Sequence, residues 1–355
     1  MSKNKNIYIA VSLIPLIFLV KILGRFPQFV EDHYSNGVYP VISSIERYVF
    51  GWLPFSFGDL VYAGAIIIII RWLLRNRRRF FKDTKGWFIE VFAVITIIYL
   101  AFHIFWGMNY YRQPLHVTLN IQDEYTSEEL LDLTNRLIDK VNGIQEELAR
   151  NDSTEVVMPY SKNEMLKRAP EGYEVLKQQY PHLEYHPRSV KRSLFSIPLT
   201  YMGFSGYLNP LTNEAQVDGL IPAYKFPTTT CHEIAHQLGY AAENEANFVG
   251  GLAAIHNPDR HFQYSGYAFA LRHCLNEIFR RDEQLFNDYM EKVNIGVLKN
   301  YQEVRDFWES YRNPTEPLFK ATYGAYLQSN NQEGGIESYS YVVALIVNYY
   351  KEHSL

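Results

Sequence analysis

Residues 228–251 read TTTCHEIAHQLGYAAENEANFVGG, and the interpretation of the whole chain starts from this stretch. Within it, His232, Glu233 and His236 have the spacing His-Glu-x-x-His. Residues four apart share one face of a helix, so both imidazoles are able to reach one metal ion. The glutamate between them stands where it activates water, a pattern typical of zinc-dependent hydrolases. The alternative is a capping box between Thr230 and Glu233 with two unrelated histidines.

Two imidazoles leave a zinc ion in need of a third protein ligand and one open position. Gly239 is suited to end the motif helix, and a second helix is expected from about residue 242. We favour Glu243 as the third ligand, because it shares a helix face with the small residue Gly250, which permits close approach to the motif helix. Asn247 lies on the same face and is expected to support a ligand by hydrogen bonding. Glu245 is the alternative ligand.

The 355 residues are 47% hydrophobic and divide by charge. Residues 1–108 contain 12 Lys and Arg against 6 Asp and Glu, whereas residues 109–355 contain 22 against 32. The first part also contains three apolar stretches, at about 7–24, 59–74 and 87–107, which are long enough to cross a bilayer. Because the basic residues lie between apolar spans, we expect contact with lipid and no nucleic-acid partner.

The basic loop 71–85 orients the three expected spans. Cytoplasmic loops carry an excess of Lys and Arg, so this loop and the N-terminus are expected in the cytoplasm of a bacterium. Residues 1–108 are then a multi-pass anchor in the cytoplasmic (inner) membrane. Residues 109–355 form one extracytoplasmic domain, since the later apolar stretch 341–350 is too short to return across the membrane.

Beyond the spans the sequence is typical of a mainly α fold with a small β-sheet. A helix is expected over about 126–151, begun by a capping box of Thr126 and Glu129. Short apolar runs separated by Gly, Asn and Pro predict strands within 186–226. Within them, residues 213–222 are either an edge strand that pairs with a peptide or a hairpin in the core. Further helices are expected in the segments 161–168, 171–179, 242–256, 262–292, 300–312, 315–329 and 337–352.

The stretch HEIAHQLGYAAENEANF, together with the preceding GYLNPLTNEAQVDGLIP, resembles an uncharacterised bacterial family of membrane-anchored proteins, a domain of unknown function with N-terminal transmembrane helices. FSFGDLVY (56–63), YSGYAFAL (264–271) and GIESYSYVVALIVNYY (335–350) match its pattern as well. More distantly, the motif pair is similar to that of the glutamate-zincin peptidases. That resemblance implies an α+β zincin-like domain with Glu243 as ligand and Asn247 as support for a histidine. The short gap after His236 departs from the pattern and keeps Glu245 open.

The expected function is hydrolysis of peptide bonds in an extracytoplasmic peptide or protein, with Zn²⁺ as cofactor. Glu233 is expected to take the proton from water and return it to the leaving amine. The oxyanion needs a second donor, for which Tyr339 is the first choice and His256, His261, Tyr264 and Tyr267 are further candidates.

The rival hypothesis is a catalytically silent membrane sensor or scaffold that binds zinc and peptides. An intramembrane protease is disfavoured, because the motif stretch is too polar for a lipid-facing span. Two cysteines, Cys231 and Cys274, exclude a disulfide scaffold.

Overall fold

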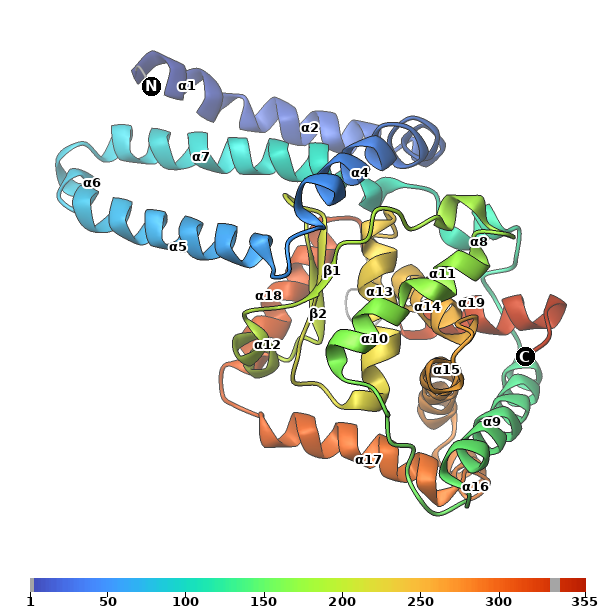
Figure 1. Cartoon of the computed structure of the whole chain (residues 1–355). Coiled ribbons are helices and arrows are strands. Elements are labelled where there is room, and N and C mark those ends of the chain that lie inside the picture. The colour runs from blue at the N-terminus through green and yellow to red at the C-terminus, as the bar shows by residue number, and fades with distance from the viewer. Residues whose placement is uncertain (1–2, 333–338) are drawn as a thin grey trace.

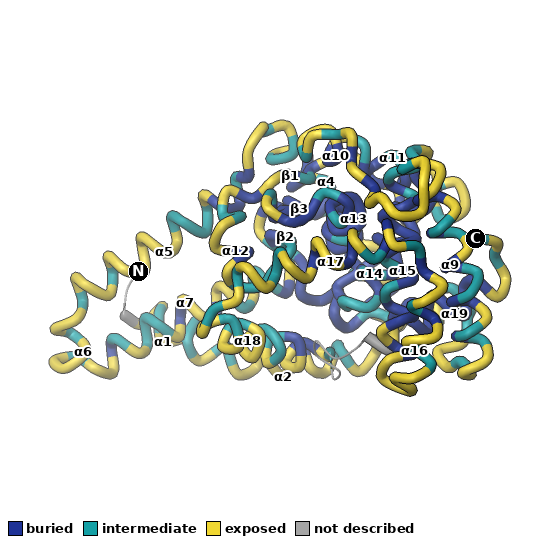
Figure 2. The backbone as a smooth tube through the Cα atoms, turned by 90° about the horizontal axis from the view of Figure 1, so that it is seen from below, coloured by how far each residue is buried: buried dark blue, intermediate teal, exposed yellow. Residues whose placement is uncertain are grey.

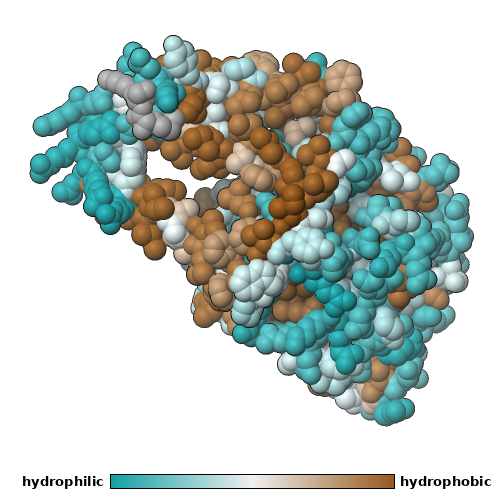
Figure 3. All heavy atoms as spheres, turned by 45° about the horizontal axis from the view of Figure 1, so that its top comes forward, coloured by the Kyte–Doolittle hydropathy of each residue, from teal (hydrophilic) through white to brown (hydrophobic). Residues whose placement is uncertain are grey.

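The computed structural model describes residues 3–332 and 339–355 and is mostly helical (Figure 1). Three of its helical segments are long and apolar enough to cross a membrane, which confirms the expected candidates. The first combines α1 (Lys3–Val11) and α2 (Leu13–Leu23), the second is α5 (Phe57–Asn76), and the third is α7 (Thr84–Phe105). Their side chains are largely exposed and form hydrophobic bands on the surface (Figures 2 and 3). Such bands indicate a membrane protein.

The connections between the spans are short helices. Between α2 and α5 lie α3 (Pro27–Val30), the π-helix η1 (Glu31–Val38) and α4 (Tyr39–Phe50). The basic loop contains α6 (Arg79–Lys82), which lies at the end of the spans farthest from the globular part (Figure 1). After α7 follow η2 (Gly107–Tyr111) and α8 (Leu115–Leu119).

The globular part is built from helices around a small sheet. Its helical elements are, in chain order, α9 (Ser127–Ala149), α10 (Lys162–Arg168), α11 (Pro170–Leu176), η3 (Pro181–Leu183), α12 (Ser196–Met202), η4 (Ala223–Lys225), α13 (Phe226–Gln237), α14 (Glu243–Ile255), α15 (Arg260–Arg281), α16 (Glu283–Met290), α17 (Ile295–Ser310), α18 (Glu316–Ser329) and α19 (Tyr339–Glu352).

Two of the helix predictions need correction. The helix expected over 262–292 is divided at Asp282, whose extended backbone ends α15 and whose carboxylate caps α16 at Leu285. The helix α12 was not expected within the strand region 186–226. Its proline, Pro198, lies in the first turn, where backbone N–H groups have no intrahelical partner and proline is tolerated. The capping box of Thr126 and Glu129 at the start of α9 is confirmed.

The sheet has three strands in the order β1 (Val190–Arg192), β3 (Glu214–Val217), β2 (Gly206–Asn209). β1 runs parallel to β3, and β2 runs antiparallel to it. Of the two alternatives for 213–222, the edge strand is therefore wrong and the hairpin in the core is confirmed: β3 is the central strand, and all four of its residues are buried. The antiparallel hairpin with β2 leaves β2 as an outer strand, next to the motif helix.

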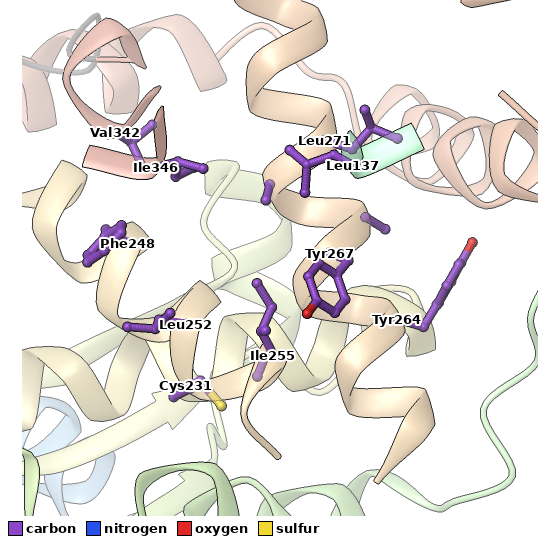
Figure 4. Close-up of a cluster of buried hydrophobic side chains, with 14 of the residues drawn as sticks. Leu137, Cys231, Phe248, Leu252, Ile255, Tyr264, Tyr267, Leu271, Val342 and Ile346 are labelled. Atoms are coloured by element: carbon purple, nitrogen blue, oxygen red, sulfur yellow. The ribbon is translucent and has the colours of Figure 1, made fainter. Parts of the chain in front are cut away.

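The main hydrophobic core lies between α9, α13, α14, α15 and α19. Figure 4 shows Leu252, Ile255, Tyr267, Leu271 and Ile346 meeting from α14, α15 and α19. Cys231 on α13 joins the same core, and both cysteines are free and buried. The motif helix is thus held on one side by the core and on the other by the sheet.

The start of α5 is bonded directly to the sheet. Glu214 accepts hydrogen bonds from the backbone N–H groups of Phe57 and Gly58 and forms an ion pair with Lys191. Asp59 accepts from the Leu194 N–H at 2.6 Å. Since these carboxylates are fully buried and charge-assisted hydrogen bonds are strong, the start of α5 is fixed firmly to the sheet. A second hydrophobic cluster likewise crosses the predicted domain boundary at residue 108, combining Val20, Val30, Tyr39, Trp106, Met108, Tyr110, Tyr111, Ala241 and Leu327.

Candidate metal centre

The motif helix and the following helix approach each other closely. α13 ends at Gln237, and Gly239 turns the chain with φ +90°, a conformation that glycine adopts without strain. α14 then begins at Glu243, as the sequence predicts. Its Gly250 packs on the backbone of α13, where a Cβ at position 250 would lie only 2.5 Å from the backbone nitrogen of His232. The small face of α14 therefore does bring Glu243 up to the two histidines.

His232, His236 and Glu243 form one cluster. One ligand atom from each lies within 4.8 Å of the other two, which is the spacing required around a single metal ion. Nε2 of His232 is 3.4 Å from Oε2 of Glu243, and Nε2 of His236 is 3.6 Å from Oε1. Two imidazoles and one carboxylate are the donor set of many zinc hydrolases. The residues therefore fit a zinc ion with one position left open.

The ring of His236 is fixed by its surroundings. Its Nδ1–H donates to the carbonyl of Tyr240 at 2.7 Å, so the lone pair is on Nε2, which faces Glu243. The backbone carbonyl of His236 accepts from Nε1 of Trp106 at 3.1 Å, and that of Gln237 accepts from the hydroxyl of Tyr39 at 2.9 Å. Residues beside the membrane spans thus position the end of the motif helix.

The charges in the cluster favour a bound cation. Burial opposes ionisation of Glu243, but hydrogen bonding to His232 and the two imidazoles lower its pKa to about 2. Burial lowers the pKa of His236 to about 4. The carboxylate is therefore charged and this imidazole is neutral near pH 7, which are the states that coordinate a metal.

Glu233 lies beside the cluster. Its side chain is buried, and burial raises its pKa to about 8. Within the described part of the chain its Oε2 has no hydrogen-bond partner, which is costly for a buried oxygen unless a bound group satisfies it. Gly206 of β2 lies directly against it, since a Cβ there would be 2.6 Å from Oε1 of Glu233. The outer strand β2 and the carboxylate of Glu233 therefore share one site.

The structure distinguishes the two candidate glutamates. Glu245 lies away from the histidines, and its Oε1 accepts a hydrogen bond from the Leu115 N–H at 2.6 Å. Two residues correspond to roughly 200° around a helix, so Glu245 points to the face opposite Glu243. The structure therefore brings Glu243, and not Glu245, up to the two histidines. Asn247, one turn after Glu243, lies beside His232, where it and Glu243 raise the pKa of that imidazole against the effect of burial.

Of the five expected oxyanion donors, the four whose side chains the structure describes have partners outside the cluster. Tyr339 is the first residue of α19, and its side chain falls outside the residues that the structure describes. The other four candidates have different partners: His256 contacts the Leu252 carbonyl, His261 contacts Asp259, Tyr264 donates to Asn300, and Tyr267 lies beneath Lys140.

Sequence reasoning missed Tyr323 on α18. Its hydroxyl donates to Oε1 of Glu243 at 2.6 Å, and its ring contacts Phe204 with centroids 5.2 Å apart. No local pattern in a chain with 28 tyrosines distinguishes this residue. Its role comes entirely from the packing of α18 over the cluster.

Comparison with known families gives one result. A family model described as "Protein of unknown function (DUF3810)" matches residues 34–347. The chain belongs to this DUF3810 family. The match includes the second and third spans, the sheet and the whole metal cluster, so these parts form one evolutionary unit. No curated protein and no solved structure matches the chain.

Proposed function

We propose that this DUF3810 protein is a membrane-anchored, zinc-dependent metallopeptidase with a zincin-like domain. The observation that carries the proposal is the convergence of His232, His236 and Glu243 around one point, with Glu233 beside it. A structural zinc site usually has four protein ligands, whereas three ligands plus a nearby carboxylate are the arrangement of hydrolytic sites.

In the proposed reaction, different residues of the chain hold the metal, transfer the proton and stabilise the oxyanion. A bound zinc ion would supply a Lewis acid that polarises the scissile carbonyl and acidifies water. Glu233 takes the proton from the attacking water and delivers it to the leaving amine. The raised pKa of Glu233 in the absence of a cation suits a group that alternates between base and acid. Tyr323 donates to Glu243 and so holds that ligand, and its hydroxyl is our candidate for the donor to the developing oxyanion.

The strand β2 is the part of the proposed site that would bind a peptide backbone. It is the outer strand on its side of the sheet, and Gly206 lies against Glu233. An extended peptide that pairs with this edge by main-chain hydrogen bonds would run past the cluster. The central strand β3 within 213–222 has neighbours on both sides, so its edges are not free for a peptide.

The proposed location is the bacterial cytoplasmic membrane, with the metal cluster on the extracytoplasmic side. The basic loop that contains α6 lies at the opposite end of the spans from the cluster (Figure 1). If basic loops are cytoplasmic, the cluster faces outward, close to the membrane surface.

The test uses the full-length chain in detergent or nanodiscs. The wild type should bind about one zinc per chain and hydrolyse members of a peptide library, and a chelator should stop the hydrolysis. Glu233→Gln should keep the zinc and lose the hydrolysis. A chain that binds zinc but cleaves no peptide would favour the sensor or scaffold hypothesis, and an active Glu233→Gln variant would exclude the proposed base.

A further inference from the structure

The three spans do not form a closed bundle. Along α5, the five consecutive residues Ile66 to Ile70 are exposed by 55%, 64%, 68%, 50% and 51%. Five consecutive helical residues point in all directions around the axis, so none of the residues that the structure describes covers α5 there. On α7, Ile98 is 59% exposed. Figure 3 shows open space between the hydrophobic bands of the spans. We call this opening, between the Tyr62 and Ile66 side of α5 and the Ile98 and Phe102 side of α7, the span slot.

The end of the span slot near α6 is closed. Trp72 of α5 contacts Trp87 of α7 with ring centroids 5.3 Å apart, and Phe80 contacts Trp87 at 5.2 Å. Arg79 and Glu90 form an ion pair at 2.9 Å beside these rings. The slot is therefore a lateral opening whose far end is sealed, and its open sides face lipid.

The other end leads to the metal cluster along two aromatic walls. On one side, Tyr62 of α5 stacks on Tyr207 of β2 with centroids 6.0 Å apart, and Tyr207 follows Gly206, which touches Glu233. Its neighbour one turn along α5 on the same face is Ile66. This wall thus connects an uncovered membrane surface to the proposed base.

The second wall runs from α7 through α18. Phe102 contacts Tyr326 with centroids 6.1 Å apart, Tyr326 stacks on Tyr323 at 5.9 Å, and Tyr323 donates to Glu243. The rings of both walls are only partly buried: Tyr62, Phe102, Tyr207, Tyr323 and Tyr326. Partly exposed rings line an opening, whereas the tyrosines of the core, such as Tyr264, are fully buried.

From this continuity we propose that the substrate is a protein anchored by a single apolar transmembrane helix, which enters the span slot laterally and is cleaved just outside the membrane. The inference rests on the proposed peptidase function. A transmembrane helix satisfies its own backbone groups, so it can lie in the slot within lipid. Where it leaves the slot its chain can extend along β2, which holds Glu233 at its side. Next to Tyr62, Ala63, Gly64 and Ala65 give α5 a low surface, and a Cβ at Gly64 would meet nothing within 4 Å. Small residues of this kind permit close helix–helix contact in membranes.

The first experiment measures docking without turnover. A photo-crosslinking amino acid replaces Ile66 in the Glu233→Gln chain in nanodiscs, and replaces Ile14 as the control. Ile14 lies on the outer surface of α2 and is 62% exposed. The probe is a transmembrane helix of roughly 20 Leu and Ala residues followed by a ten-residue peptide. This peptide is one that the wild type cleaves in free form. If no free peptide is cleaved, a ten-residue segment of mixed sequence takes its place. The proposal requires stronger capture of the probe at Ile66 than at Ile14.

The second experiment compares cleavage of the ten-residue peptide in free form, joined to the helix, and joined to a palmitoyl chain. Because anchoring in the slot raises the local concentration of the peptide, kcat/KM should rise about 100-fold with the helix. Ile66→Trp should reduce that gain, whereas Ile14→Trp should preserve it, with the thermal unfolding midpoint checking that both variants fold.

Each remaining outcome has one meaning. Equal capture at both positions, or equal cleavage of free and helix-anchored peptide, overturns the proposal and leaves the peptidase function standing. A gain with palmitate as large as with the helix also overturns it, since lipid partitioning then explains the effect. Capture at Ile66 without hydrolysis by the wild type supports docking and refutes the peptidase function.

Discussion

Gly206→Ala tests whether β2 and Glu233 form one site. The new Cβ would lie 2.6 Å from Oε1 and 2.9 Å from Cδ of Glu233, and 2.8 Å from the backbone oxygen of Gln216. Ordinary contact begins near 3.4 Å, so the carboxylate must move by about 0.8 Å. A misplacement of about 1 Å at a reacting group costs about 100-fold in rate, equal to about 2.7 kcal/mol of activation free energy. We therefore expect kcat to fall about 100-fold, while the zinc content is unchanged because no metal ligand is touched.

The assay is hydrolysis of a peptide that the wild type cleaves, measured with zinc content and thermal unfolding. The backbone oxygen of Gln216 cannot move as easily as a side chain, so a loss of stability of about 1–3 kcal/mol is also expected. Gly143→Ala is the matched control, because its Cβ would meet nothing within 4 Å and it lies in the helix α9. It should gain about 1 kcal/mol of stability with no change in rate. An unchanged kcat in Gly206→Ala would refute the placement of Glu233 against β2, and loss of zinc would show collapse of the site instead of a shifted base.

Three further predictions concern the ligands, Tyr323 and pH. Glu243→Ala should lose zinc, measured by metal analysis after dialysis, whereas Glu245→Ala should keep it. Glu245→Ala should also lower the free energy of unfolding by about 1–3 kcal/mol, because it leaves the buried Leu115 N–H unpaired. Loss of zinc from Glu245→Ala but not from Glu243→Ala would reassign the ligand. Tyr323→Phe should weaken zinc affinity or kcat by about 10- to 100-fold, because it loses the hydrogen bond to Glu243. Zinc affinity is measured by competition with a chelator, and kcat by hydrolysis of the peptide. Values within about twofold of the wild type would exclude a role of Tyr323 in holding Glu243. Burial raises the pKa of Glu46 from 4.5 to about 8, so the folded state holds the proton more tightly than the unfolded state. The contribution of Glu46 to the free energy of unfolding should thus be highest below pH 4.5. It should fall by up to about 5 kcal/mol as the pH rises from 4.5 through 8. Glu46→Gln should remove that pH dependence in thermal unfolding, and an unchanged slope would contradict it.

The spans and the metal motif could be predicted because their signals are local. A span is recognised from a run of apolar residues, whose cost of exposure to water depends only on composition. His232 and His236 share a face because helix periodicity fixes it, and Gly239 ends the helix because its backbone conformation is tolerated there. The position of Glu243 beside the two histidines has a related reason, since a small face on α14 permits close packing against α13.

The remaining parts were decided by contacts between distant segments. β3 is the central strand because β1, more than 20 residues earlier, pairs with the side of β3 that β2 leaves free. No pattern within 213–222 predicts this pairing with β1. Whether Glu243 or Glu245 faces the histidines depended on the rotation of α14, which is set by its packing.

By itself, then, the sequence determined the three candidate membrane spans, the mainly α fold with a small sheet, and the face that carries His232, Glu233 and His236. The tertiary structure alone decided that Tyr323 contacts Glu243 across 80 positions, that Gly206 lies against Glu233, and that the walls of the span slot lead to the cluster. The physical reason is that periodicity and composition report the energetics of neighbouring residues. The partners of a side chain across the molecule are instead fixed by the packing of the whole chain.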